Sequence, residues 1–287
     1  MKMRKYIVIL TLGILALGVC SSCRRGRENP EEVRYSMRED VEFTASASGY
    51  VTKATDWALE NGDEIGIFAL DPIDALNVKG TVNGGKVTTA TPVKWEFNQK
   101  QVSRFAAYLP YVENLDGMSL WFNVKADQSA YAAYEASDLR YAVADARPGN
   151  PVELKFQHAL SKLVVVMETQ DVEVQSVVTG EIVTGLTLNI VDGNVEATSL
   201  KGTVTMGAAV EANGSVGHTA ILVPQKGVFP LKVTLKGGTV IDATMPTTVT
   251  LEPGIAYKAT IGLTGTFRLE VTDWADDGQI PYIIKGQ

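Results

Sequence analysis

Side chains that most often act as metal ligands or nucleophiles are scarce in this chain of 287 residues. The two histidines, His158 and His218, are 60 positions apart, and the two cysteines, Cys20 and Cys23, both lie near the N-terminus. A zinc site needs His, Cys, Asp or Glu clustered at ligand spacing, and no segment matches the EF-hand loop. The sequence therefore predicts no metal ion and no cofactor, and a calcium ion in an irregular loop is the alternative left open.

Sequence motifs of the common catalytic sites are also missing. The chain contains no G-x-S-x-G nucleophile elbow, no phosphate-binding loop and no G-x-G-x-x-G turn. His158 stands in ELKFQHAL, where Leu154, Phe156 and His158 fall on one face of a predicted strand. A histidine that continues an apolar face is expected to be a hydrogen-bonded core residue rather than a catalytic base. We predict from these features that the protein is not an enzyme.

The N-terminus has the pattern of a lipoprotein signal. A basic stretch, MKMRKY, precedes an apolar stretch, IVILTLGILALGV, and CSSC follows where cleavage would occur. The apolar run is shorter than the roughly 20 residues of a membrane-spanning helix, so residues 1–22 are a predicted signal peptide. Cys23 follows two serines, whereas Cys20 follows the bulkier Val19, which predicts lipid attachment, such as palmitate, at Cys23. An ordinary signal peptide with two incidental cysteines is the alternative.

The charge of the chain disfavours nucleic acid as a partner. The net charge is −7, and the predicted signal peptide carries three cations and no acid, so the mature chain is near −10. Nucleic-acid-binding domains are usually basic. The one basic cluster, Arg24, Arg25 and Arg27, directly follows the predicted lipid and is expected to be part of a solvated tether.

Apolar and polar residues alternate with a period of two along most of the remaining chain, which predicts half-buried strands. The apolar faces are Val93, Trp95 and Phe97; Leu120, Phe122 and Val124; Leu186, Leu188 and Ile190; Leu231, Val233 and Leu235; and Tyr257, Ala259, Ile261 and Leu263. Gly and Asn turn signals separate them, which indicates an all-β protein of sandwich type. The alanine-rich segment 126–139 is the exception, and it predicts a short helix capped by Asp127.

These patterns suggest how the chain is divided. Residues 23–40 are polar and predict a flexible leader. The stretch ARPGNP, residues 146–151, interrupts the alternation with two prolines and a glycine. We therefore expect an N-terminal β-sandwich domain over 41–147, which includes the short helix, and a C-terminal β-sandwich domain over 152–287.

Three stretches resemble the fimbrillin-like lipoproteins of Bacteroides and its relatives. SDLRYA (137–142) followed by VELKFQHALSKLVVVM (152–167) is similar to the family's D-L-x-Y-A segment and its F-x-H-A-L-S-K strand. VTKATDWALENGDEIGIFAL (51–70) is similar to the family's threonine-basic-alanine-threonine segment with a G-D-x-I-G-x-F strand. LEVTDWADDGQI (269–280) resembles its closing strand and tryptophan. The resemblance spans about 41 to 280.

The resemblance implies two tandem transthyretin-like β-sandwich domains in a surface-exposed outer-membrane lipoprotein that is a pilus subunit or tip adhesin. It also implies partners, namely other pilus subunits and a trypsin-like or arginine-specific maturation protease. In polymerising members the protease removes the leader and the first strand, and a strand of another subunit fills the groove that is left. Candidate cleavage positions here are Arg34, Arg38 and Lys53, where lysine departs from arginine specificity. The alternative is that these are ordinary surface cations.

A second hypothesis comes from the aromatic residues. Trp121 is the one tryptophan predicted to face outward from a strand, and Tyr131 and Tyr134 follow it in the predicted helix. These three side chains could form a ligand platform on a free-standing outer-membrane lipoprotein that binds host glycan or host protein without polymerising.

Overall fold

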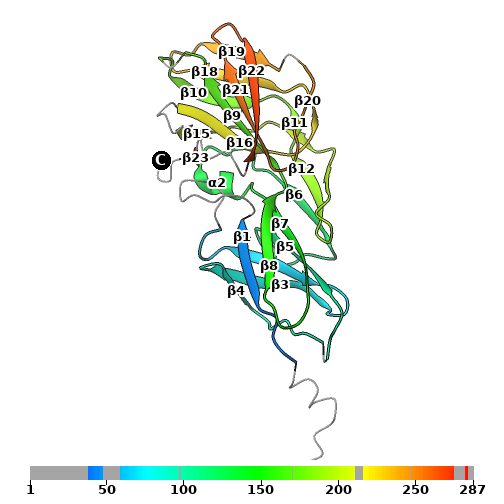
Figure 1. Cartoon of the computed structure of the whole chain (residues 1–287). Coiled ribbons are helices and arrows are strands. Elements are labelled where there is room, and N and C mark those ends of the chain that lie inside the picture. Colours follow the sequence, from blue (N-terminus) through cyan, green and yellow to red (C-terminus); the bar gives the residue numbers. More distant parts are fainter. Residues whose placement is uncertain are drawn as a thin grey trace, which may run out of the picture. The chain divides into compact units, whose positions relative to one another are not determined.

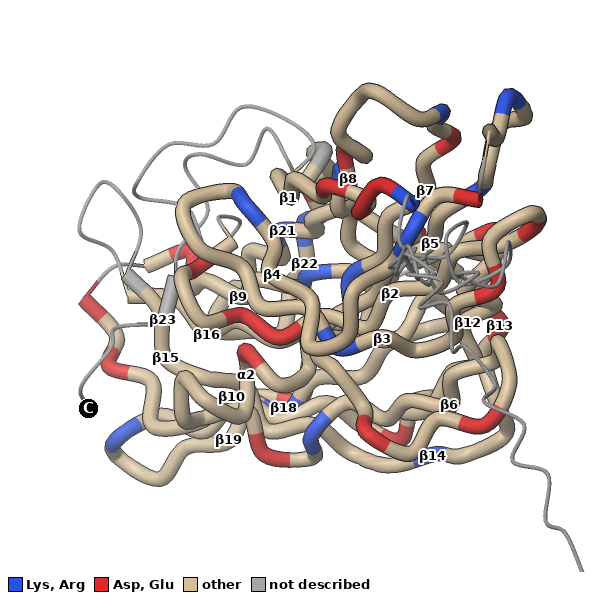
Figure 2. The backbone as a smooth tube through the Cα atoms, turned by 90° about the horizontal axis from the view of Figure 1, so that it is seen from below, with Lys and Arg blue, Asp and Glu red and all other residues tan. Residues whose placement is uncertain are grey.

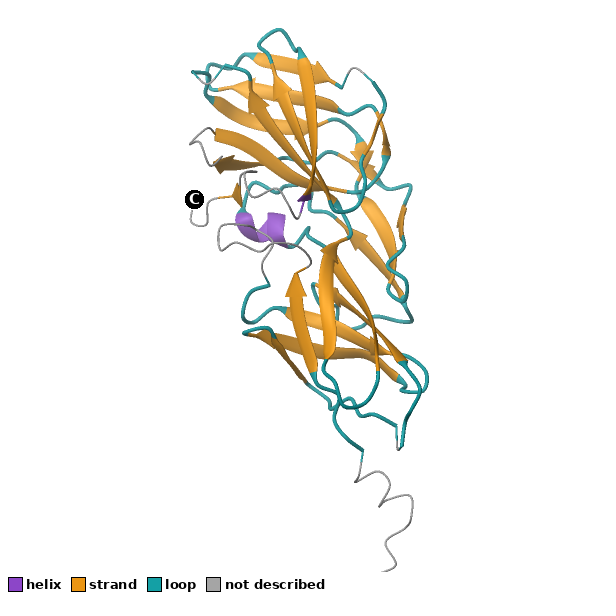
Figure 3. Cartoon of the chain, in the orientation of Figure 1, coloured by secondary structure: helices purple, strands orange, loops and turns teal. Residues whose placement is uncertain are grey.

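The computed structural model describes residues 38–47, 59–96, 98–169, 171–210, 216–245, 247–274 and 282–283. Strands dominate these residues, and the described α-helix is the single turn α2 (Tyr131–Glu135), as Figure 3 shows. The predicted all-β fold with a short helix is confirmed. Among the described residues no helix is long and apolar enough to cross a membrane.

The first group of strands forms a closed barrel in the order β1-β4-β3-β2-β5-β7-β8 (Figure 1). Phe43, Phe105 and Phe156 lie in its apolar core together with Val152 and Leu154. Six of the seven neighbouring pairs are antiparallel, and β1 closes the barrel by pairing in parallel with β8. The strands are β1 (Phe43–Ala47), β2 (Glu64–Ala69), β3 (Ala75–Asn83), β4 (Lys86–Thr89), β5 (Ser103–Leu109), β7 (Arg140–Ala146) and β8 (Val152–His158).

The remaining strands enclose a second, larger core. The largest sheet has the order β22-β21-β9-β16-β15-β23, and two three-stranded sheets, β10-β18-β19 and β13-β12-β6, contribute apolar residues to the same core. The bounds are β6 (Ser119–Asn123), β9 (Ser161–Met167), β10 (Val174–Thr179), β12 (Gly185–Asn189), β13 (Val195–Ala197), β15 (Gly207–Val210), β16 (Val216–Leu222), β18 (Pro230–Leu235), β19 (Val240–Thr244), β21 (Ile255–Ile261), β22 (Phe267–Asp273) and β23 (Tyr282–Ile283). Two short pairs complete the fold, β11 (Ile182–Val183) with β14 (Lys201–Gly202) and β17 (Lys226–Gly227) with β20 (Val249–Thr250).

Sheet membership does not follow the expected boundary between 41–147 and 152–287. The ARPGNP stretch is the loop that joins β7 to its antiparallel neighbour β8, so the strand after the loop belongs to the barrel. In the other direction, β6 precedes the loop but pairs with β12. Proline and glycine fit a hairpin loop as well as a linker, and sequence alone does not separate the two. The division into two domains remains a prediction.

The predicted burial of alternating faces is largely confirmed. Leu186, Leu188 and Ile190 are fully buried, and Leu231 and Val233 are nearly so. Val93 and Trp95 are also buried, but their segment forms only an isolated bridge, Asp40 with Lys94, instead of a strand. Phe97 lies outside the described residues. Leu263 is exposed because β21 ends at Ile261.

The predicted cap of the helix is wrong. The helix begins at Tyr131, and its N-cap residue is Ala130, which makes no side-chain cap hydrogen bond. Oδ1 of Asp127 instead accepts a hydrogen bond from the backbone N–H of Ser129, 2.9 Å away. The Asp side chain therefore closes a local turn that competes with helix initiation.

The backbone of β2 comes close to an aromatic ring at Gly66. A Cβ atom at this position would lie 2.2 Å from Cε1 of Tyr108. The Tyr108 hydroxyl donates to Oδ1 of Asn77 at 2.9 Å, and burial raises the pKa of Tyr108 to about 12. Glycine is required here because its missing side chain makes room for the ring.

Candidate functional site

Residues from two of the three family-like stretches, 137–142 with 152–167 and 269–280, meet in a buried cluster. Asp138 follows α2, Arg140 begins β7, His158 ends β8, and Trp274 follows β22. The antiparallel register of β7 and β8 places Arg140 opposite His158. Each of these four residues is at most 7% exposed. We refer to Asp138, Arg140, His158 and Trp274 as the signature cluster.

The carboxylate of Asp138 connects the members of the signature cluster. Its Oδ1 lies 2.6 Å from Nδ1 of His158, and its Oδ2 accepts hydrogen bonds from Nε and Nη2 of Arg140 at 2.6 and 2.5 Å. The imidazole of His158 stacks on the indole of Trp274 with ring centroids 3.5 Å apart and an interplanar angle of 2°. Nζ of Lys162, a fully buried residue of β9, lies 5.8 Å from the same indole. These contacts tie the barrel strands β7 and β8 to the six-stranded sheet.

The charges in the signature cluster are mutually compensating. Burial of Asp138 opposes ionisation of its carboxyl, but the charges of Arg140 and His158, with their hydrogen bonds, outweigh it and lower the pKa of Asp138 to about 2. Asp138 is therefore ionised at neutral pH. Removing one partner of such a buried ion pair leaves the charge of the other partner buried and uncompensated. The cluster thus has the properties of a structural joint, and His158 is confirmed as a hydrogen-bonded core residue.

The described residues show no cluster suited to metal binding. No three or more His, Cys, Asp or Glu side chains among them could hold a metal ion together. The second histidine, His218, is 5% exposed, and burial lowers its pKa to about 4, so its ring is neutral at pH 7. Figure 2 shows acidic and basic residues interspersed along the chain.

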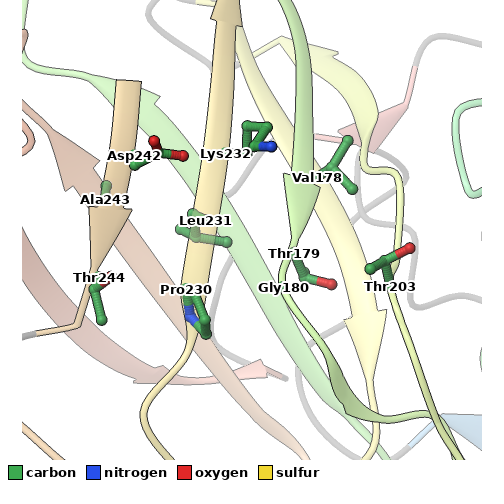
Figure 4. A pocket seen from close by; sticks show the side chains of 10 residues that line it. All are labelled: Val178, Thr179, Gly180, Thr203, Pro230, Leu231, Lys232, Asp242, Ala243 and Thr244. Carbon is green, nitrogen blue, oxygen red and sulfur yellow. The ribbon is translucent and has the colours of Figure 1, made fainter. Parts of the chain in front are cut away.

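A surface hollow of about 260 Å³ lies over β10, β18 and β19 (Figure 4). Pro230 packs over Gly180 at one end, where a Cβ on the glycine would lie 2.7 Å from Cγ of the proline. Lys232 and Asp242 stand opposite each other in the register of β18 and β19. Lys232 and Asp242 are the ionisable side chains of the described lining.

The first strand of the barrel is held by two neighbours. β1 pairs in parallel with β8 from Phe43–Val152 to Ala47–Phe156, and antiparallel with β4 at Phe43–Val87 and Thr44–Lys86. Its inner face is buried, and the ring of Phe43 meets that of Phe105 edge to face at 5.6 Å. β1 therefore contributes both backbone hydrogen bonds and apolar side chains to the barrel core.

The candidate cleavage residues flank β1 on different sides. Arg38 lies five residues before β1, and its Nη2 forms an ion pair with Glu96 at 2.8 Å. Arg34 precedes it, and Lys53 follows β1 in the sequence. Arg34, Lys53 and the predicted lipid site Cys23 all lie outside the described residues. Sequence order alone dictates that a cut at Arg34 or Arg38 leaves β1 covalently attached to the barrel, whereas a cut at Lys53 breaks this covalent link.

The three aromatic residues predicted to form a platform do not share a surface. Trp121 on β6 is 60% exposed, as predicted, but Tyr134 in α2 is 3% exposed and belongs to the large core. Tyr131 is half-buried against the same core. Figures 1 and 2 both show α2 and β6 well apart. The part of the prediction that includes Tyr134 is therefore wrong, because the helix turns this ring inward.

Comparison with known proteins places these features in a family. The model of the fimbrillin-like family matches residues 52–274, which is well over half of the chain. This chain belongs to the fimbrillin-like family. The match ends at Trp274 and includes all four residues of the signature cluster, but it begins after β1. No curated protein sequence matches the chain significantly.

Solved structures show the same fold. A candidate cell adhesion protein from Bacteroides uniformis is 22% identical, with a TM-score of 0.64 over 83% of this chain and 99% of that one. A candidate cell adhesion protein from Bacteroides ovatus is 18% identical, with a TM-score of 0.66 over 83% and 98%. The tip fimbrial protein Mfa3 from Porphyromonas gingivalis, with a C-terminal truncation, is 13% identical, with a TM-score of 0.52 over 82% and 100%.

Sequence inspection identified the segments of the signature cluster but not that they meet. The available signal was the presence of Asp138, Arg140 and His158 within the family-like stretches. If those segments had been placed on adjacent strands, Asp138 would have been expected to lie buried between Arg140 and His158. Lys162 is the lysine of the same F-x-H-A-L-S-K stretch, but the sequence does not indicate that its side chain is fully buried.

Proposed function

We propose that this fimbrillin-like protein is a non-enzymatic pilus subunit or tip adhesin, exported as an outer-membrane lipoprotein acylated at Cys23. It assembles with other pilus subunits by donor-strand exchange after a protease removes the leader together with β1. Family membership supports a pilus or adhesion protein and a surface or pilus location. The observation that carries the finer proposal is the position of β1, which lies between two strands and fills the core of a closed barrel.

Loss of β1 would create a binding groove. The edges of β4 and β8 would lose their backbone partner, and the pockets now filled by Val41, Phe43 and Ala45 would open. An extended strand of a second subunit restores both, because main-chain hydrogen bonds give affinity and alternate side chains fill the pockets. Such a head-to-tail contact does not close on itself, so it propagates into a filament.

Of the three candidate cleavage positions, only Lys53 follows β1 in the sequence, so only a cut there can lead to loss of the strand. A protease that accepts lysine as well as arginine can cut at Lys53 and release β1. Of the three candidate positions, a strictly arginine-specific protease can cut only Arg34 and Arg38, and a cut there removes the lipid and leader while β1 stays in the barrel. The proposal therefore names a trypsin-like protease as the maturation partner for strand exchange.

The test compares the two protease specificities on the purified chain from residue 24 onward. Samples are treated with a trypsin-like or an arginine-specific protease and run unboiled on a denaturing gel. We expect a ladder of resistant multimers only with the trypsin-like protease, and none with Lys53→Ala. Arg38→Ala is the matched control and keeps the ladder. A clean monomer after cleavage at Lys53 contradicts the proposal and favours a free-standing lipoprotein that binds host glycan or protein.

A further inference from the structure

The outer surface of the three-stranded sheet β13-β12-β6 carries an exposed tryptophan. Trp121 is 60% exposed, whereas its neighbour Leu120 on the same strand is 2% exposed and faces the core. Across the sheet, Leu186 and Leu188 of β12 are fully buried. One side of this sheet is therefore packed on the core, and the other presents a large aromatic ring to solvent. Tryptophan is enriched at binding interfaces because its ring combines a large apolar body with a polar N–H group.

The residues around Trp121 form a regular array. Paired residues in antiparallel strands point to the same side of a sheet, so the register places Trp121, Thr187 and Glu196 in one row. The row on one side contains Asn123, Gly185 and Thr198, and the row on the other contains Ser119, Asn189 and Asn194. We call these nine residues the Trp121 face. Strand spacing makes the face about 10 Å wide and about 13 Å long.

The composition of the Trp121 face suits a neutral, hydroxyl-rich ligand. Apart from the tryptophan and the glycine, its side chains are hydroxyls, amides and one carboxylate, and none of the nine is lysine or arginine. The flat indole can pack against the C–H faces of a sugar ring, and the amides and hydroxyls can both donate and accept hydrogen bonds. The face has no cation to attract sulfated or sialylated ligands, and the carboxylate of Glu196 would repel their negative charge. Such anionic ligands are therefore disfavoured.

Gly185 shapes the row next to the tryptophan. A Cβ atom here would lie 2.6 Å from both Oδ1 of Asn123 and Oγ1 of Thr198. The amide of Asn123 therefore lies across the space that a side chain would fill. Its Oδ1 is buried and makes no hydrogen bond with the described residues. A small rotation of the amide lets this oxygen accept a hydrogen bond from a ligand hydroxyl. That hydrogen bond removes the energetic cost of leaving a buried acceptor unsatisfied.

We propose that the Trp121 face is a binding site for a neutral saccharide, with a sugar ring packed on Trp121 and its hydroxyls bonded to Asn123 and Thr187. The site is separate from β1 and its neighbours, since β6 and β12 do not belong to the barrel. It therefore does not depend on strand exchange. A strand-exchanging subunit and a free-standing lipoprotein could each use it.

The test uses the chain from residue 24 onward on an array of neutral and anionic glycans, followed by titration calorimetry with the best neutral ligand. We expect Trp121→Ala to weaken binding at least about tenfold, as for a central aromatic anchor, and Trp121→Phe to lose less. Leu263→Ala is the matched control, because Leu263 is 52% exposed and lies outside the Trp121 face. A bound saccharide should also shield Trp121 from acrylamide quenching of its fluorescence.

Several outcomes would overturn the proposal. These are no binding to any neutral saccharide, binding confined to anionic glycans, and binding that Trp121→Ala leaves unchanged while the variant keeps the unfolding midpoint of the parent. A loss of multimers in Trp121→Ala, in a protein that binds no glycan, would instead assign the face to a protein contact between subunits. Failure of the multimer test alone would leave saccharide binding unaffected, so the two proposals fail separately.

Discussion

Replacing Asp138 by asparagine tests whether the signature cluster is an electrostatic joint. The two side chains have nearly the same size, so the substitution leaves no cavity and mainly removes the negative charge. Arg140, which is 7% exposed, then loses its ion pair with the Asp138 carboxylate. Breaking a buried pair on one side typically costs about 3–5 kcal/mol. A loss of that size is a large part of the roughly 5–15 kcal/mol that stabilises most domains.

The lowered pKa of the Asp138 carboxyl also predicts that the stability of the fold depends on pH. Its pKa is about 2 in the folded chain and 3.8 without the fold. A depressed pKa adds stability above the unfolded value, here about 2 kcal/mol, and this contribution is lost as the pH falls toward the folded value. About 1 kcal/mol of it should disappear between pH 5 and pH 3. Asp138→Asn should lack this part of the pH dependence.

The assay is urea unfolding of the chain from residue 24 onward, followed by circular dichroism at pH 7, 5 and 3. Asp145→Asn is the matched control, because Asp145 forms an exposed ion pair with Arg104 at 3.3 Å. Exposed pairs contribute about 0–1 kcal/mol. If Asp138→Asn lowers the free energy of unfolding by less than about 1 kcal/mol, or by no more than the control, the signature cluster is not an electrostatic joint that stabilises the fold.

Two further substitutions probe packing by the same unfolding assay. Trp274→Ala removes the ring stacked on His158 and leaves a cavity, so it should lower the free energy of unfolding by about 3–5 kcal/mol, and a loss below 1 kcal/mol would show that the stack is dispensable. Gly66→Ala places a Cβ 2.2 Å from the Tyr108 ring and should cost about 1–3 kcal/mol. Gly227→Ala, where nothing lies within 4 Å of the added Cβ, should be near neutral, and equal effects of the two would contradict this account.

The strands could be predicted from sequence because burial of one face leaves a period of two. Leu186, Leu188 and Ile190 show this directly, since all three are fully buried. The pattern gives the face but not the neighbour, because alternation is the same whichever strand lies alongside. This is why β6 could be predicted as a strand while its pairing with β12, across the expected domain boundary, could not.

The signature cluster was beyond prediction for a related reason. Asp138 and His158 are 20 positions apart, and Trp274 is far from both in the sequence. A lone histidine on an apolar face indicates burial, but only the folded topology shows which acid and which ring it meets. The same holds for Tyr134, whose helix could be predicted but whose inward orientation depends on where that helix packs.

The strand β8 connects the structural joint with the proposed exchange of β1. One edge of β8 pairs with β1 along five residues, and its other edge pairs with β7. Its last residue, His158, is fixed by Asp138 and by the stack on Trp274. Departure of β1 would therefore remove one neighbour of β8 while β7 and the signature cluster still hold the strand in place. A groove whose wall keeps its position is preorganised for an incoming strand, and preorganisation lowers the entropic cost of binding. The buried cluster that distinguishes these segments thus lies where a strand-exchanging protein would most need rigidity.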